Sequence, residues 1–213
     1  MNLSHFLYIL SVASPLVPIL TGIRVRGLLW YYVLLSGLCD GLTILRLFPE
    51  TPHWNGNIFL AAQFVLVNAY FIQELLPKGE RRTLAWVLVG CITAAFLFYT
   101  IRQGFWDVNY PAGAVLIGLL IIPVLGGFYD IMRREQVLHL ERSPFFIFCA
   151  AFLLYVSGSF LIMVYAPRFK TEDHRALILM WVSIHNSLNI LKNGAIARAL
   201  YLYAHPRPAH ERP

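Results

Sequence analysis

Seven long apolar stretches, separated by short polar segments, fill almost the whole chain. Each stretch approaches the roughly 20 apolar residues that a helix needs to cross about 30 Å of hydrocarbon. The pattern therefore predicts a single all-α domain, residues 1–213, built as a polytopic membrane bundle of seven transmembrane helices. The expected spans lie at about 5–23, 28–48, 57–76, 83–101, 110–132, 144–165 and 176–201.

The composition supports a chain whose main partner is the lipid bilayer. Hydrophobic residues make up 58% of it and charged residues only 13%, against about 25% charged residues in a soluble domain. The formal net charge of +6 would suggest nucleic-acid binding in a soluble protein. Here the basic residues lie in the loops between spans, where the positive-inside rule accounts for them. We therefore expect no nucleic-acid partner.

The distribution of Lys and Arg predicts the orientation, because cytoplasmic loops carry an excess of both. An outside N-terminus places eleven basic residues on the inner side and five on the outer side, with Lys192 inside the last span. We therefore expect the N-terminus out and the C-terminus in. The inner residues are Arg24, Arg26, Lys78, Arg81, Arg82, Arg133, Arg134, Arg142, Arg198, Arg207 and Arg212, and the outer ones are Arg46, Arg102, Arg168, Lys170 and Arg175.

No motif for catalysis, metal binding or a cofactor stands out. The cysteines Cys39, Cys91 and Cys149 all lie within spans, and no pair has metal-ligand spacing. The chain lacks H-E-x-x-H, G-x-S-x-G and P-loop sequences. We therefore expect neither an enzyme nor a metal site nor a bound cofactor.

Prolines interrupt two of the expected spans. Pro15 and Pro18 lie in the first and Pro123 in the fifth. Each removes a backbone hydrogen bond, and in lipid the freed carbonyl must be satisfied by a neighbour or by cavity water. Simple shaping of the helices is one explanation, and a hinge or a cavity wall is the other.

The last span carries a polar stripe. His185, Asn189 and Lys192 are spaced i, i+4, i+7 and share one helical face, which Asn186 and Asn193 widen. Amide and ionisable side chains are costly in hydrocarbon, so such a stripe must face the bundle interior or a watery cavity. We expect this face to form part of a binding site.

The third span carries a second polar set. Gln63, Tyr70 and Glu74 share a face, and Glu74 reaches a depth similar to that of Lys192, so the two charges are expected to be able to pair. Asp40 in the second span is nearest in depth to His185 and Asn186. Amides can also act only as interhelical contacts. The predicted polar cavity, between the second, third and seventh spans, consists of Asp40, Gln63, Asn68, Tyr70, Glu74, His185, Asn186, Asn189 and Lys192.

A short internal repeat suggests one family. Pro18-Ile19-Leu20-Thr21-Gly22 resembles Pro123-Val124-Leu125-Gly126-Gly127, and Asn68 in the third span matches Asn186 in the seventh. The segment from Ser14 to Arg26 is similar to the first helix of the SWEET carriers, although the PQ motif of the wider PQ-loop superfamily is missing. That resemblance implies a parallel 3+1+3 repeat and a small-solute, sugar-like transporter with Asn68 and Asn186 or Asn189 at its substrate site.

A second resemblance covers more of the chain. The proline-rich first span, the segment Asn68-Ala69-Tyr70-Phe71-Ile72-Gln73-Glu74, the segment Tyr155-Val156-Ser157-Gly158 and residues 181–193 resemble uncharacterised bacterial seven-helix inner-membrane proteins of a sensor-like kind. The resemblance implies an inner-membrane sensor or receptor-like module that binds a small ligand or lipid. It would act through a cytoplasmic signalling partner on the basic inner loops. Association of copies through the glycine-rich fifth span is the other expected partnership.

Overall fold

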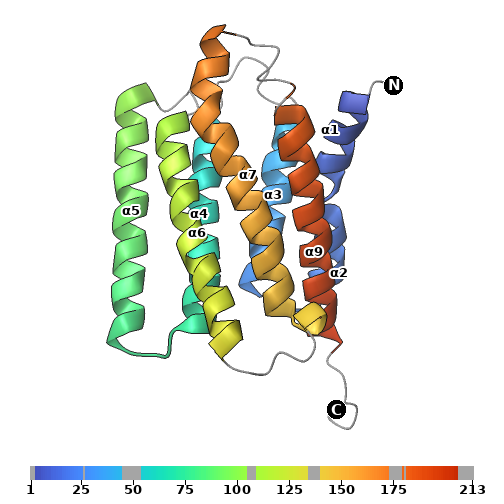
Figure 1. Cartoon of the computed structure of the whole chain (residues 1–213), viewed down its shortest axis with the longest axis vertical. Coiled ribbons are helices and arrows are strands. Elements are labelled where there is room, and N and C mark those ends of the chain that lie inside the picture. The colour runs from blue at the N-terminus through green and yellow to red at the C-terminus, as the bar shows by residue number, and fades with distance from the viewer. Residues whose placement is uncertain are drawn as a thin grey trace.

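The structure is a computed structural model that describes residues 3–25, 27–44, 54–104, 109–133, 140–172, 179 and 181–205. All regular secondary structure in these ranges is helical, so the all-α prediction is confirmed for them (Figure 1). The helices are α1 (Leu3–Ala13), α2 (Leu16–Gly22), α3 (Leu28–Ile44), α4 (Trp54–Leu75), α5 (Glu80–Gly104), α6 (Tyr110–Arg133), the 3-10 turn η1 (Leu140–Arg142), α7 (Pro144–Glu172), the π-helical turn η2 (Trp181–His185) and α9 (Asn186–Ala204).

Within the part of the chain that the structure describes, four helices are long and apolar enough to cross a membrane, which supports a membrane protein. They contain the candidate spans Gly56–Leu75, Glu80–Gly104, Tyr110–Arg133 and Pro144–Pro167. Two further apolar segments, Phe6–Gly22 and Leu28–Gly41, are shorter. The end of the expected second span, 45–48, and the start of the seventh, 176–178, lie outside the described residues.

Local chemistry explains where several helices begin and end. Pro15 separates α1 from α2, as the sequence suggested, so the expected first span is two helical segments rather than one. Gly79 just before α5 has φ 146° and Gly104 at its end has φ 110°, a region in which a side chain would be strained. Pro123 lies inside α6 without ending it, so this proline shapes the helix and does not break it.

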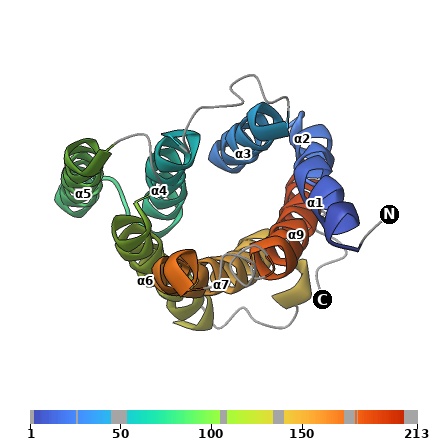
Figure 2. The ribbon, with the colours of Figure 1, turned by 90° about the horizontal axis from the view of Figure 1, so that it is seen from above.

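The helices α2, α3, α4, α6, α7 and α9 form a ring, and α5 lies outside it (Figure 2). Around the ring, α2 packs on α3, α3 on α4, α4 on α6, α6 on α7 and α7 on α9, and α9 closes the circle on α2. α1 continues α2 along the outer side of α9. α5 packs mainly against α4 and more lightly against α6. α9 therefore packs mainly against α7, α2, η2 and α1 and more lightly against α3. The third span, α4, is not one of its main packing partners.

Aromatic rings fill the centre of the ring of helices. Phe148 and Phe152 of α7 stack with centroids 5.2 Å apart. Tyr32 of α3 meets Phe152 at 5.7 Å, and Tyr70 of α4 meets Phe148 at 4.7 Å. Aromatic pairs of this kind add roughly 0.5–1.5 kcal/mol to their area burial. They join α3, α4 and α7 across the interior.

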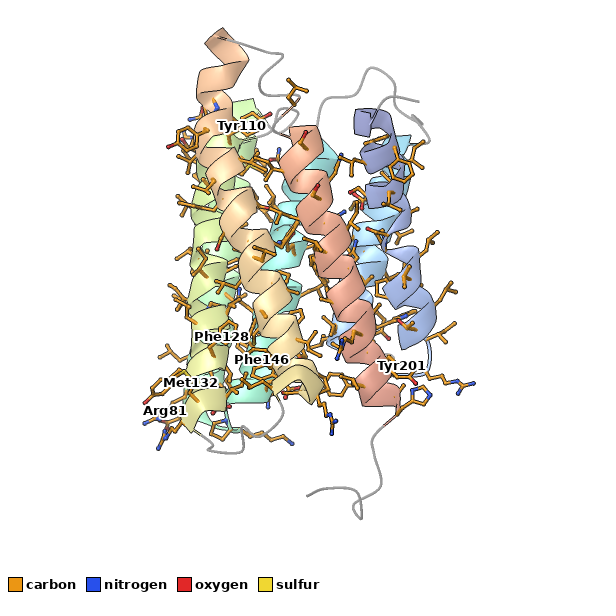
Figure 3. All side chains as sticks on the ribbon, turned by 45° about the vertical axis from the view of Figure 1, so that its right-hand side comes forward. Arg81, Tyr110, Phe128, Met132, Phe146 and Tyr201 are labelled. Carbon is orange, nitrogen blue, oxygen red and sulfur yellow. The ribbon has the colours of Figure 1, made fainter. Side chains whose placement is uncertain are left out.

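The two ends of the bundle differ in charge. Figure 3 places Arg81, Met132 and Tyr201 at one end and Tyr110 at the other. The C-terminus leaves from the Arg81 end, and the N-terminus lies at the opposite end (Figure 1). Most of the basic residues with described side chains flank helix termini at the Arg81 end, namely Arg24, Lys78, Arg81, Arg82, Arg133, Arg142 and Arg198. Arg102 lies at the other end of α5.

Candidate functional site

The polar stripe of α9 faces the interior of the protein. Asn186, Asn189 and Lys192 are buried, and Lys192 is only 1% exposed. Asn193, one residue further, is also fully buried. The spacing of these residues predicted an inward face, and their burial is the direct result of α9 packing between α2 and α7.

The polar stripe of α9 donates hydrogen bonds to the break between α1 and α2. Pro15 has no N–H, so the carbonyl of Ser11, four residues earlier, loses its helical partner. Ser14 Oγ donates to that carbonyl oxygen at 2.6 Å, and Asn189 Nδ2 lies 3.5 Å from it. Asn189 Nδ2 also donates to Ser11 Oγ at 3.1 Å. A side chain of α9 thus provides part of the hydrogen bonding that the proline removes from α1.

A second amide of α9 extends the same network. Asn193 Nδ2 donates to Ser14 Oγ at 2.7 Å and lies 3.5 Å from Asn189 Oδ1. Ser14 therefore accepts from α9 and donates to α1, which connects the two helices through one hydroxyl. Among the described residues, the buried Asn193 Oδ1 and Asn186 Nδ2 have no hydrogen-bond partner.

Lys192 is held by two tyrosines. Its Nζ donates to Tyr32 Oη on α3 at 3.1 Å. The same ammonium lies 4.2 Å from the ring centroid of Tyr155 on α7 and 5.2 Å from that of Tyr32. A cation over an aromatic face gains roughly 2 kcal/mol or more when it is desolvated. We call Lys192, Tyr32, Tyr155 and Asp40 the lysine cluster.

Asp40 is the acid of this cluster. It lies on α3, close enough to Lys192 for an electrostatic interaction, and Asn189 lies beside it. Its Oδ2 is buried and has no hydrogen-bond partner among the described residues. His185 in η2 packs on Tyr155, with ring centroids 5.8 Å apart, and also interacts electrostatically with Lys192. The structure thus brings Asp40, His185, Asn189 and Lys192 together.

The expected pairing of Glu74 with Lys192 does not form. Among the described residues the ammonium contacts Tyr32 and Tyr155, whereas Glu74 is exposed near the C-terminal end of α4 and lies close to Tyr70 and Tyr203. The similar depth expected for the two charges was wrong, because Glu74 lies at the level of Tyr203. Tyr203 comes eleven residues after Lys192 in α9, roughly 16 Å further along the helix axis. In addition, α9 packs on α2 and α7 rather than on α4.

The other candidates on α4 also lie apart from the lysine cluster. Gln63 is buried, and its Oε1 has no hydrogen-bond partner among the described residues. Asn68 donates to the carbonyl of Phe64 in its own helix at 2.8 Å. Tyr70 does reach α9, because its hydroxyl lies 3.1 Å from that of Tyr203. The predicted cavity between the second, third and seventh spans is therefore not a single site.

A groove of about 640 Å³ opens between α3, α4 and α5. Its lining is apolar apart from Thr93, whose hydroxyl donates to Val89 in its own helix, and it includes none of the nine candidate residues. The groove and the lysine cluster lie on different faces of α3. The groove is lined by Tyr31, Leu34, Leu35, Leu38, Ile58, Ala61, Ala62, Val65, Leu66, Thr93 and Leu97.

Asn193, which widens the polar stripe, and four further residues of the polar network were not among the nine candidates. Ser11 and Ser14 could have been found, since Ser11 is the residue whose carbonyl Pro15 must orphan. Tyr32 and Tyr155 had no such signal, because a tyrosine in an apolar span is more often an interface anchor. Their roles follow only from the packing of α3 and α7 around α9.

In comparisons with protein-family models, curated proteins and solved structures, no match to this chain was found. The function must therefore be argued from the chemistry of the cluster. One lysine, one carboxylate, one imidazole and two phenols converge at a buried position. Such a set can bind a small polar or charged molecule and exchange a proton with it.

Proposed function

We propose that this chain is a multi-pass protein of the bacterial inner membrane with seven spans, an outside N-terminus and an inside C-terminus. The described helices form seven rods if α1 with α2, and η2 with α9, each count as one. The basic end of the bundle is also the end from which the C-terminus leaves, in line with the positive-inside rule. A fluorescent protein fused after residue 213 should fluoresce, and a periplasmic phosphatase fused there should be inactive. The opposite pattern would contradict the orientation.

Within this topology the protein acts as a sensor or receptor-like module whose ligand binds at the lysine cluster. One observation carries the proposal: the Lys192 side chain is only 1% exposed inside the bundle, and the half-buried Asp40 on α3 is near enough to interact with it electrostatically. Burying two charges is expensive, and well-packed apolar side chains are often as stable or more stable. Intramembrane ionisable residues accordingly mark functional sites by default.

Helix α9 provides a route from the cluster to the inner side. It runs unbroken from Asn186, beside the cluster, to Ala204, near the basic end. There Tyr203 meets Tyr70 of α4 through their hydroxyl groups. A ligand that shifts α9 would alter this contact and the surface around it. The basic end is then the docking surface for a cytoplasmic partner with acidic groups.

The rival function is a small-solute carrier, and the ring of helices favours it in one respect. α2, α3 and α4 follow one another around the ring, and α6, α7 and α9 do the same, with α5 outside as the connection (Figure 2). This is the arrangement expected of a 3+1+3 repeat. The two asparagines expected at the substrate site give less support to a carrier. Asn68 donates a hydrogen bond within its own helix, and Asn186 is buried on α9.

One experiment separates the two functions. Purified protein is screened by thermal unfolding against amines, carboxylates, amino acids and sugars, with Asp40→Asn as the control. If the lysine cluster is a receptor site, at least one compound should stabilise the wild type but not Asp40→Asn. Proteoliposomes are then tested with that compound. Saturable uptake that is lost in Asn186→Leu would show that the protein is a carrier and not a receptor. If the thermal-unfolding screen finds no compound whose effect depends on Asp40, both proposed functions of the lysine cluster are refuted.

A further inference from the structure

The surroundings of Lys192 are complementary to a cation. The Tyr155 ring presents its negative face to the ammonium at 4.2 Å, and the Tyr32 hydroxyl accepts a hydrogen bond from it at 3.1 Å. Asp40 adds a carboxylate whose buried Oδ2 has no hydrogen-bond partner among the described residues. Lys192 itself is the positive charge at the centre of this arrangement. Tyr32, Tyr155 and Asp40 therefore form a cation-binding site, which we call the cation cage. The cation that occupies it is the ammonium group of Lys192, a residue of α9.

The unsatisfied atoms beside the cage are mostly acceptors. Asp40 Oδ2 and Asn193 Oδ1 both need a donor. Buried acceptors left without donors cost roughly 1–3 kcal/mol each. A ligand rich in N–H donors and positively charged would satisfy them. An anion would meet the carboxylate of Asp40 and the ring faces, both of which repel it.

We propose that the ligand of this cluster is a small organic ammonium, which takes the place of the Lys192 ammonium between Tyr32, Tyr155 and Asp40. The inference rests on the proposed receptor function and adds the chemical class of its ligand. It applies equally to the carrier, because it concerns only what the site recognises.

Charge balance sets how the exchange occurs. One carboxylate can compensate one buried cation, so the bound ammonium and a protonated Lys192 cannot share the cage. Lys192 therefore gives its proton to water as the ligand binds, and its neutral amine remains beside the ligand. The other titratable groups that face Lys192 are Asp40 and Tyr32 on α3, Tyr155 on α7 and His185 in η2. Release of one proton makes the ligand affinity rise about tenfold per pH unit while Lys192 is protonated in the free protein.

Chemical rescue tests the cage directly. Lys192→Ala deletes Cγ, Cδ, Cε and Nζ, and n-propylammonium has the same four heavy atoms. Thermal unfolding of the purified variant is followed in nanodiscs with n-propylammonium, propionate or 1-propanol added. We expect n-propylammonium to raise the midpoint by several degrees with saturation, and the other two compounds to have little effect. Equal rescue by 1-propanol would show that filling of a cavity is sufficient, and it would overturn the proposal.

Two controls sharpen the result. Lys192→Met keeps the volume of the side chain, so n-propylammonium should not stabilise it. Asp40→Asn combined with Lys192→Ala should lose most of the rescue, because the carboxylate is gone. Rescue that survives in the double variant would overturn the role given to Asp40.

The wild type provides a readout that does not depend on the folding of Lys192→Ala. Its unfolding midpoint should rise with n-propylammonium, more strongly at pH 8 than at pH 6.5, and Asp40→Asn should not respond. An unresponsive wild type would overturn the ammonium ligand. If a carboxylate or sugar stabilised the wild type through Asp40 instead, the receptor function would stand and only the ligand class would fail.

Discussion

Asn189 of α9 reaches across to Ser11 of α1, where its Nδ2 lies 3.1 Å from the hydroxyl oxygen and 3.5 Å from the carbonyl oxygen. That carbonyl lacks a helical donor because the residue four positions later is Pro15. The amide thus joins two features that are far apart in the sequence, a proline break and a polar stripe. Four sets of variants test how strongly these and other contacts stabilise the bundle.

Replacing Asn189 by Leu should destabilise the protein by about 1–2 kcal/mol, since Ser11 then loses a donor at a buried position. In a Pro15→Ala background the helical N–H can return and the same replacement should cost less. The free energy of unfolding is measured in mixed detergent with SDS. Hydrogen exchange in residues 3–13 should accelerate in Asn189→Leu. An equal loss in both backgrounds would show that Asn189 does not compensate for the proline.

A double-mutant cycle tests the coupling of Asp40 and Lys192. Lys192→Met leaves the half-buried carboxylate of Asp40 without the cation near it, which should cost about 1–3 kcal/mol, and Asp40→Asn should cost a similar amount. The double variant should be clearly less destabilised than the sum of the two. A coupling energy below about 0.5 kcal/mol, within the usual error of additivity, would mean that the two charges act independently.

Gly158 on α7 allows close approach of α9. A Cβ at this position would overlap Leu188 Cδ1, the flexible end of that side chain, so Gly158→Ala should destabilise by about 1 kcal/mol, the low end of the cost of overpacking. Leu188→Ala in the same chain should recover part of that loss, because it removes the overlapping methyl group. Gly90→Ala is the matched control, since a Cβ there would meet no atom within 4 Å. Destabilisation without recovery would point to a backbone effect in α7.

The hydroxyl contact between Tyr70 and Tyr203 joins α4 to the end of α9 at 3.1 Å. Tyr70→Phe and Tyr203→Phe should each cost about 0.6–1 kcal/mol, a usual value for an interhelical hydrogen bond in a membrane protein. Because both remove the same bond, the double variant should cost little more than either single one. Additive losses in the SDS unfolding assay would show that the hydroxyls have separate partners.

Much of the fold could be predicted from the sequence. Apolar length located the helices, and Pro15 marked the break between α1 and α2 because a proline cannot donate its N–H. The inward face of α9 followed from the i, i+4, i+7 spacing of its polar residues. These features depend on local chemistry, which a single sequence records directly.

The lateral arrangement of the helices could not be predicted in the same way. Depth suggested Glu74 as the partner of Lys192, but the packing of α9 against α2 and α7 directs the ammonium to Tyr32 and Tyr155. That packing depends on shape, for example on the missing side chain of Gly158. Hydrophobic periodicity carries little of this information in lipid, where apolar residues cover every face of a helix.

The outlying place of α5 has a consequence for how the molecule can be assembled. The ring closes through α4 against α6 and through α9 against α2, and neither junction needs α5 to lie between them. Two polypeptides, 1–104 and 105–213, made separately in one cell should therefore find each other and rebuild the whole protein. Recovery of a paired complex with the unfolding midpoint of the intact chain would identify each half as an autonomous building block, consistent with an ancestral gene that was copied and joined.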